Sequence, residues 1–200
     1  LGKIYAIDAE YWYGRQHKLT DGWRNSVKNY SVMAGGGIHL MDTMFMMIDE
    51  RPSTCFSVGN RICTENTKFK YNDFVTSIYS FKSSIIARIT ANFGCVHRHQ
   101  HVLRIFGDRA TFLLDDAGPR IHATRDNITH GLQDKTSAVI PIDREYRPPH
   151  KGDLILPFIS QITQGIDSTP LAQRNFDVMS AIIAADNSVK LKKEIAVEYV

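Results

Sequence analysis

A histidine and an aspartate lie one helical turn apart, directly after three glycines. His39 and Asp42 occur in GGGIHLMD, residues 35–42. Residues with this spacing share one face of a helix, where Asp42 can orient the imidazole of His39. The start of a helix also disfavours an added positive charge, which would keep His39 neutral and able to accept a proton. The pattern makes His39 a candidate general base, with the polar side of an ordinary amphipathic helix as the alternative.

A second histidine-rich segment, residues 97–101, alternates three histidines with Arg98 and Gln100. In an extended strand the histidines project from one face. Consecutive positions on one face lie about 6.5–7 Å apart, a spacing that suits one tetrahedral zinc ion poorly. We therefore expect no metal site here. Instead we expect a polar surface facing a ligand or a subunit, in which His97 and His99 orient the substrate.

Aromatic and cationic side chains also gather between residues 13 and 24. The segment contains YGRQHK at residues 13–18, followed by a tryptophan and an arginine. Guanidinium groups bind carboxylates and phosphates, and they donate hydrogen bonds to hydroxyl groups. We expect a substrate-binding loop that uses Tyr13, Arg15, His17, Trp23 and Arg24. A solvated basic loop anchored by one tryptophan is the alternative.

Composition and charge exclude several classes of protein. The 200 residues include 24 Lys and Arg against 21 Asp and Glu, for a net charge of +3, which does not indicate a nucleic-acid or membrane-surface partner. The longest apolar-leaning run, residues 38–48, is too short to span a bilayer. The three cysteines form no CxxC pair, which argues against a disulfide framework and favours a reducing, cytoplasmic location.

Hydrophobic periodicity predicts the elements that position these residues. We expect a strand over residues 3–13, a long loop over 15–33, a chain break at the three glycines, and a helix ending before Pro52. Period-two alternation predicts further strands over 54–64, 73–81, 85–93, 99–106, 110–115 and 120–125. A polar stretch follows to about Lys151. Helical spacing then returns over residues 154–162 and around 176–183, and residues 194–200 close the chain as a strand.

This order predicts one α+β domain over residues 1–200. We expect a broad, mostly antiparallel β-sheet, built as a meander, with helices packed on one face. The open face then needs a cover, which predicts a homo-oligomer formed through it. No GxGxxG turn joins a strand to a helix, and no βαβ alternation occurs. We therefore expect no cofactor-binding residues in this chain.

Six segments in a fixed order carry a family resemblance. They are the opening strand at residues 1–5, YGRQHK at 13–18, GGGIHLMD at 35–42, NRICTENTKFKYNDF at 60–74, ARITANFGCVHRHQHVLRIFG at 87–107 and ATFLLDDAG at 110–118. In combination they resemble the C-terminal domain of the Gfo/Idh/MocA family, named after glucose-fructose oxidoreductase, inositol dehydrogenase and a rhizopine-catabolism protein. The resemblance covers nearly all of the chain.

The resemblance implies an oxidoreductase acting on a sugar, sugar derivative or cyclitol. This chain would be its substrate-binding and oligomerisation domain, while an N-terminal Rossmann domain, absent from this chain, would bind NAD or NADP. His39, with Asp42 three residues later, matches the family's catalytic histidine. Gly35 occupies the position where many members carry an acidic residue, and the family's glutamate-lysine-proline motif has no equivalent here. The alternative is a non-catalytic binding or assembly module that lacks a dinucleotide-binding domain.

Overall fold

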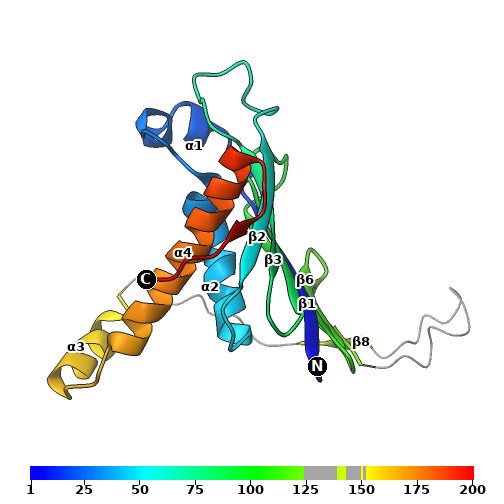
Figure 1. The fold of residues 1–200 in the computed structure, drawn as a ribbon, viewed down its shortest axis with the longest axis vertical. Helices are drawn as coiled ribbons and strands as arrows, with labels where there is room; N and C mark the ends of the chain where they lie inside the picture. The colour runs from blue at the N-terminus through cyan, green and yellow to red at the C-terminus, as the bar shows by residue number, and fades with distance from the viewer. Residues whose placement is uncertain (124–138, 143–149, 151) are drawn as a thin grey trace, which may run out of the picture.

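The central element is one twisted sheet. The computed structural model describes residues 1–123, 139–142, 150 and 152–200. Within these residues the sheet has nine strands, in the order β8-β7-β6-β5-β1-β4-β3-β2-β9 (Figure 1). They are β1 (Ile4–Trp12), β2 (Thr54–Asn60), β3 (Phe74–Ser80), β4 (Ile86–Asn92), β5 (Gln100–Gly107), β6 (Thr111–Asp115), β7 (Gly118–His122), β8 (Val139–Pro141) and β9 (Ile195–Ala196). The predicted α+β class and the broad, mostly antiparallel sheet are confirmed.

The first strand lies near the middle of the sheet. β1 pairs in parallel with β4 and antiparallel with β5, so β4 and β5 follow each other in the chain without pairing. The predicted meander is therefore wrong at this point. The alternation of buried Ile7, Ala9 and Tyr11 on one face of β1 predicts a strand but not its neighbours, because the choice of partner depends on contacts between distant segments.

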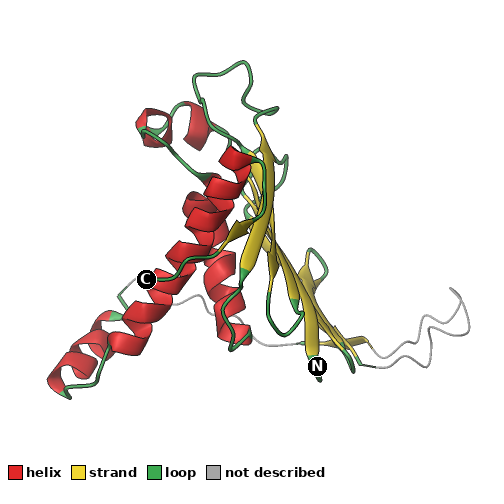
Figure 2. Ribbon diagram, viewed as in Figure 1, coloured by secondary structure: helices red, strands yellow, loops and turns green. Residues whose placement is uncertain are grey.

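Two long helices cover one face of the sheet (Figure 2). The helical elements are α1 (His17–Thr20), η1 (Trp23–Ser26), η2 (Met33–Gly37), α2 (Ile38–Met47), α3 (Ile155–Thr163) and α4 (Thr169–Leu191). The predicted apolar stripe of α2 faces the core, with Leu40, Met41 and Met44 buried. The second half of α4 contributes Ala181, Ile182 and other small or apolar side chains to the same core. By contrast, no residue of α3 is buried.

The three glycines do not break the chain as expected. They belong to η2, a π-helical turn that continues directly into α2. A Cβ on Gly36 would lie 2.6 Å from ring carbons of Tyr11 and 2.7 Å from a ring carbon of Phe93, so only glycine lets the turn approach this closely. Helical geometry begins at Val32. The helix start is therefore well over one turn before His39, beyond the range of the predicted helix-end effect.

Some predicted boundaries differ from the structure. β2 ends at Asn60, and the closing strand is reduced to β9, which pairs with β2 through two residues. β8 lies within the predicted polar stretch and pairs with the edge of β7. The last two residues of the predicted 120–125 strand lie outside the described residues. In the described ranges, no helix combines the length and apolarity needed to cross a membrane.

Candidate functional site

Three histidines surround Tyr11 at one end of the sheet. The ring centre of Tyr11 lies 4.9 Å from that of His99, 5.1 Å from that of His101 and 5.8 Å from that of His39. The His39 and His101 rings are themselves 6.2 Å apart, and the His99 and His101 rings 5.3 Å apart. All three histidines are exposed, while Tyr11 is buried beneath them. We call Tyr11, His39, His99 and His101 the histidine cluster.

The sheet register and the glycine turn bring these residues together. Tyr11 on β1 is the direct antiparallel partner of His101 on β5, so their side chains lie on the same face. Phe93, just after β4, packs against Tyr11 with a ring separation of 5.6 Å. The close approach at Gly36 then sets the start of α2, and with it His39, against the Tyr11 ring.

Electrostatic repulsion couples the histidines. Partial burial lowers the pKa of His101, and the neighbouring His99 and His39 lower it further. Burial is also the largest cause of the lowered pKa of His99, with Arg15 and His39 adding to it. These two imidazoles are therefore held toward their neutral form, in which one ring nitrogen accepts a proton or hydrogen bond.

A second ring system extends the cluster toward the loop. Tyr13 packs edge-on against His99 at 5.2 Å, and the guanidinium groups of Arg15 and Arg24 lie 5.6 Å and 5.8 Å from the Tyr13 ring centre. The Nε of Arg24 donates a hydrogen bond of 3.0 Å to the hydroxyl of Tyr30. Burial raises the pKa of Tyr30, an effect that Arg24 opposes. The loop therefore presents fixed cations at the edge of the cluster.

Trp23 lies at the outer edge of this loop. Its side chain is 64% exposed, with the Arg24 guanidinium 4.8 Å from its ring centre. Trp23 also meets Tyr30 edge-on at 6.3 Å. The structure thus brings together six of the predicted residues, namely Tyr13, Arg15, Trp23, Arg24, His39 and His99.

Asp42 makes a different contact from the one expected. Its Oδ1 accepts hydrogen bonds from Nη2 and Nε of Arg174 on α4, at 2.7 Å and 3.1 Å. Nη2 of Arg174 also donates to the backbone oxygen of Asp42 at 2.9 Å. Within the described residues no hydrogen bond joins Asp42 to His39. The aspartate therefore ties α2 to α4, where we expected it to orient the imidazole.

Two predicted substrate residues lie away from the cluster. His97 packs edge-on against Trp12 at 4.8 Å, and its Nε2 lies 3.0 Å from a carboxylate oxygen of Asp116. The prediction that His97 shares a face with His99 is wrong, because the chain bends between them and β5 begins only at Gln100. His17 is the first residue of α1, and its side chain is exposed.

The missed residues share one signal. Tyr11 lies two residues before Tyr13, on the same face of β1, and His101 lies two residues after His99. The two-residue period of a strand groups Tyr11 with Tyr13 and His99 with His101. The two pairs come together only because β1 lies beside β5 in the sheet. In the described residues, no group of three His, Cys, Asp or Glu side chains is arranged to hold a metal ion.

The cluster has the parts needed to handle a hydroxylated substrate. Aromatic rings offer flat apolar surfaces, imidazoles exchange protons near neutral pH, and guanidinium groups donate fixed hydrogen bonds. These groups lie together on the helix-covered face at the carboxyl end of β1. These residues therefore form a basic, aromatic surface site on an open α+β sheet.

Comparison with known proteins identifies the family of this chain. The family model for the GFO/IDH/MocA C-terminal domain matches residues 1–113, and the chain belongs to this family. No curated protein matches the sequence significantly.

Solved structures share the fold at low sequence identity. An NAD binding oxidoreductase from Klebsiella pneumoniae is 13% identical, with a TM-score of 0.75, covering 100% of this chain and 60% of its own. Levoglucosan dehydrogenase in complex with NADH and levoglucosan is 14% identical, with the same TM-score and coverages. An aldose-aldose oxidoreductase from Caulobacter crescentus, complexed with glycerol, is 14% identical with a TM-score of 0.71, covering 98% of this chain and 56% of its own. The chain therefore spans less than two thirds of these proteins.

Proposed function

We propose that this chain is the substrate-binding and oligomerisation domain of an NAD(P)-dependent oxidoreductase that acts on a sugar, sugar derivative or cyclitol. The observation that carries the proposal is the convergence of His39, His99 and His101 on Tyr11, in a chain that belongs to the Gfo/Idh/MocA family. The full protein also includes a Rossmann domain outside residues 1–200.

In the reaction, an alcohol carbon of the substrate becomes a carbonyl carbon. Bound NAD(P) would supply the hydride-accepting chemistry for that carbon. His39 takes the proton from the hydroxyl group as the carbonyl forms. His101 and His99, held toward their neutral forms, accept or donate hydrogen bonds at neighbouring hydroxyls, while Arg15 fixes a further oxygen.

The triple glycine of this chain does not fit a dinucleotide phosphate. Phosphate-binding glycine turns present free backbone N–H groups at the start of a helix. Here Gly36 packs against Tyr11 and Phe93, inside a continuous helical turn. The triple glycine therefore does not offer a cradle for the dinucleotide phosphates, which another domain would bind.

Asp42 acts as a positioning residue in this proposal. Its ion pair with Arg174 fixes α2 against α4 and so holds His39 beside the Tyr11 ring. Asp42 lies one helical turn after His39, so a shift of α2 would move the imidazole with it. Trp23 and Arg24 orient the substrate from the edge of the site, whereas for His97 and His17, which lie away from the cluster, substrate binding remains a proposal from the sequence alone.

The open face of the sheet is the proposed subunit contact. Phe56, Val58, Ile78 and Ile86 are 43–52% exposed there. Beside them Arg88 and Arg104 bind both Asp8 and Glu10, with ion-pair distances of 2.7–3.1 Å. Apolar side chains around satisfied charges form a surface that a second copy of the chain can cover without leaving a charge unpaired.

A cofactor assay separates the proposal from its alternative, a non-catalytic module. We expect the full-length protein to reduce NAD⁺ or NADP⁺ in the presence of at least one member of a panel of aldoses, polyols and cyclitols. The 200-residue chain alone should neither turn over these compounds nor bind NAD(P)H with micromolar affinity in calorimetry. Tight NADH binding by the isolated chain, or an inactive full-length protein across the panel, would contradict the proposal.

A further inference from the structure

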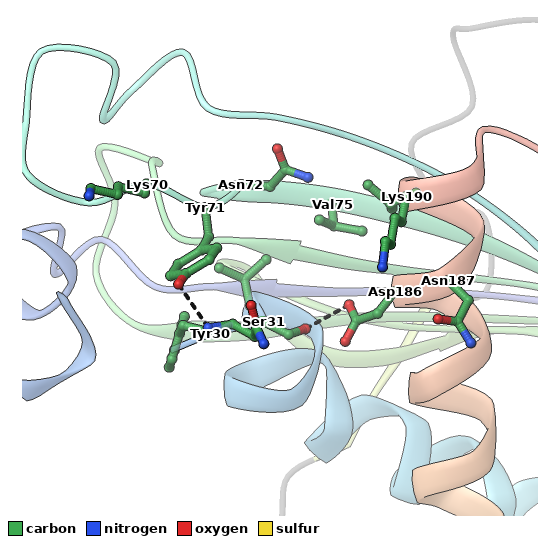
Figure 3. A pocket seen from close by; sticks show the side chains of 12 residues that line it. Tyr30, Ser31, Lys70, Tyr71, Asn72, Val75, Asp186, Asn187 and Lys190 are labelled. Atoms are coloured by element: carbon green, nitrogen blue, oxygen red, sulfur yellow. Dashed lines mark hydrogen bonds between the residues drawn. The ribbon is translucent and has the colours of Figure 1, made fainter. Parts of the chain in front are cut away.

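A cavity separate from the histidine cluster opens between α4 and two loops. It has a volume of about 560 Å³ and is lined by residues 29–32, 70–72, Val75 and part of α4 (Figure 3). None of the cluster histidines lines it. Pockets of roughly 300–1,000 Å³ are typical of small-molecule sites. The size of this cavity therefore suits a compound of hexose size or somewhat larger.

The α4 wall carries one acid and one base, a helical turn apart. Oδ1 of Asp186 accepts a hydrogen bond of 2.7 Å from the Ser31 hydroxyl, whereas its Oδ2 has no hydrogen-bond partner in the described residues. Burial raises the pKa of Asp186. Lys190 lines the same wall and makes no ion pair with Asp186 among the described residues. Figure 3 shows the Asp186 side chain projecting from α4 toward Ser31, with the Lys190 side chain beside the helix above it.

The facing wall adds aromatic rings and further donors. The Tyr71 hydroxyl accepts a hydrogen bond of 2.8 Å from the backbone N–H of Asn29, so its own proton remains available to donate. Tyr30 and Asn72 line the cavity beside Tyr71, and Val75 is buried below. The walls thus combine flat apolar surface with hydroxyl and amide groups that suit a polyol.

The charges around this cavity favour an anionic ligand. Lys190 faces the space and Lys70 lies at its edge, against a single carboxylate that is already bonded to Ser31. We propose that the cavity binds a small polyhydroxylated anion, a sugar acid or a sugar phosphate, at a site distinct from the histidine cluster. Lys190 pairs with the anionic group, while Asp186 Oδ2 and the Tyr71 hydroxyl bind hydroxyls of the ligand.

The proposal is tested by adding gluconate or glucose 6-phosphate to the protein and monitoring the backbone amide signals by NMR. Glucose provides the hydroxyls without the charge, and inorganic phosphate provides the charge without the hydroxyls. We expect at least one probe to shift the amide signals of residues 70–72 and 186–190, and to bind more tightly than glucose or phosphate. The preferred probe then distinguishes a carboxylate from a phosphate ligand.

Substitutions locate the binding and protect the test from unfolding. Because Lys190 is exposed, Lys190→Gln should fold normally and weaken probe binding by about tenfold or more, the effect of losing one charge-assisted hydrogen bond. Lys193→Gln removes the same charge outside the cavity and should leave binding unchanged. Unchanged binding in Lys190→Gln, an equal loss of binding in Lys193→Gln, or inorganic phosphate binding as tightly as both probes would overturn the proposal.

Tyr30 connects this cavity to the loop of the proposed active site. Its ring lines the cavity, while its hydroxyl accepts the hydrogen bond from Arg24, whose guanidinium lies 5.8 Å from the Tyr13 ring centre. A ligand in the cavity would therefore contact a residue that holds Arg24 in place. The binding measurements above require no turnover, so their outcome is independent of the proposed oxidoreductase activity.

Discussion

The imidazole of His101 lies 5.1 Å from the ring of Tyr11, its direct partner across the β1–β5 pair, and 6.2 Å from the imidazole of His39. One register pairing thus joins a strand from the start of the chain to the histidine-rich segment in the middle. At these separations a proton on one imidazole raises the cost of a proton on the next. The neighbouring imidazoles therefore contribute to the lowered pKa values of His99 and His101.

Replacing His39 should shift the pKa values of His99 and His101. His39→Asn removes a neighbouring cation at acid pH, so the pKa values of His99 and His101 should both rise toward the ordinary value for histidine. An NMR titration of the imidazole carbon signals measures the change. The matched control is His17→Asn, on exposed α1, which should move neither pKa. Titration curves that are identical in wild type and His39→Asn would refute the coupling.

The same shift predicts how stability depends on pH. Because the pKa of His101 is lowered in the folded state, the unfolded chain takes up a proton first as the pH falls. The folded state therefore loses stability from about pH 6.5, the ordinary histidine value, down to the lowered pKa, and this effect is absent above that window. Urea unfolding at pH 7.5 and pH 5.5 should show that the free energy of unfolding falls less between these two values in His101→Gln than in wild type. A larger fall in the free energy of unfolding of the variant would show that protonation of His101 stabilises the folded state, contrary to this prediction.

Gly36 controls how closely α2 approaches the cluster. In Gly36→Ala the new methyl group meets the Tyr11 and Phe93 rings at 2.6–2.7 Å, and this crowding outweighs the better helix propensity of alanine. We expect a loss of about 1–3 kcal/mol in the free energy of unfolding. Gly152→Ala is the control, since nothing lies within 4 Å of its Cβ position. Equal stabilities of the two variants would show that the turn does not require glycine.

The open face should control subunit association. Ile78 lies on β3 in the open face, where it is 45% exposed. Ile78→Lys therefore places a charge in the proposed contact and leaves the helix-covered core intact. Sedimentation velocity at tens of micromolar protein should show at least a dimer for wild type and a shift toward monomer for this variant. Ile62→Lys, in the loop after β2, adds the same charge elsewhere and should not alter the assembly. A wild-type protein that is strictly monomeric would remove the contact from the account.

Local patterns were enough to predict most elements, while contacts between distant segments were not. The alternation in Ile85–Phe93 and the stripe of Leu40, Met41 and Met44 both report burial directly, and the corresponding strand and helix are present. The position of β1 between β4 and β5 depends on competition between possible strand partners, which no local pattern encodes. The Asp42 to Arg174 pair joins residues 132 positions apart. Helical spacing pairs Asp42 with His39, one turn away, and carries no signal for a partner as distant in the chain as Arg174.

The central claim is that His39 accepts the substrate proton, and turnover of the full-length enzyme tests it most directly. His39→Asn should lower kcat by about 10²- to 10⁴-fold and remove the lower-pH limb of the rate profile, with the fold retained. Asp42→Asn should lower kcat less, since it loosens the α2 to α4 contact without removing the base. Full activity of a folded His39→Asn enzyme with its true substrate would contradict the account, and would leave Tyr13 or a lysine of the Rossmann domain as the proton acceptor.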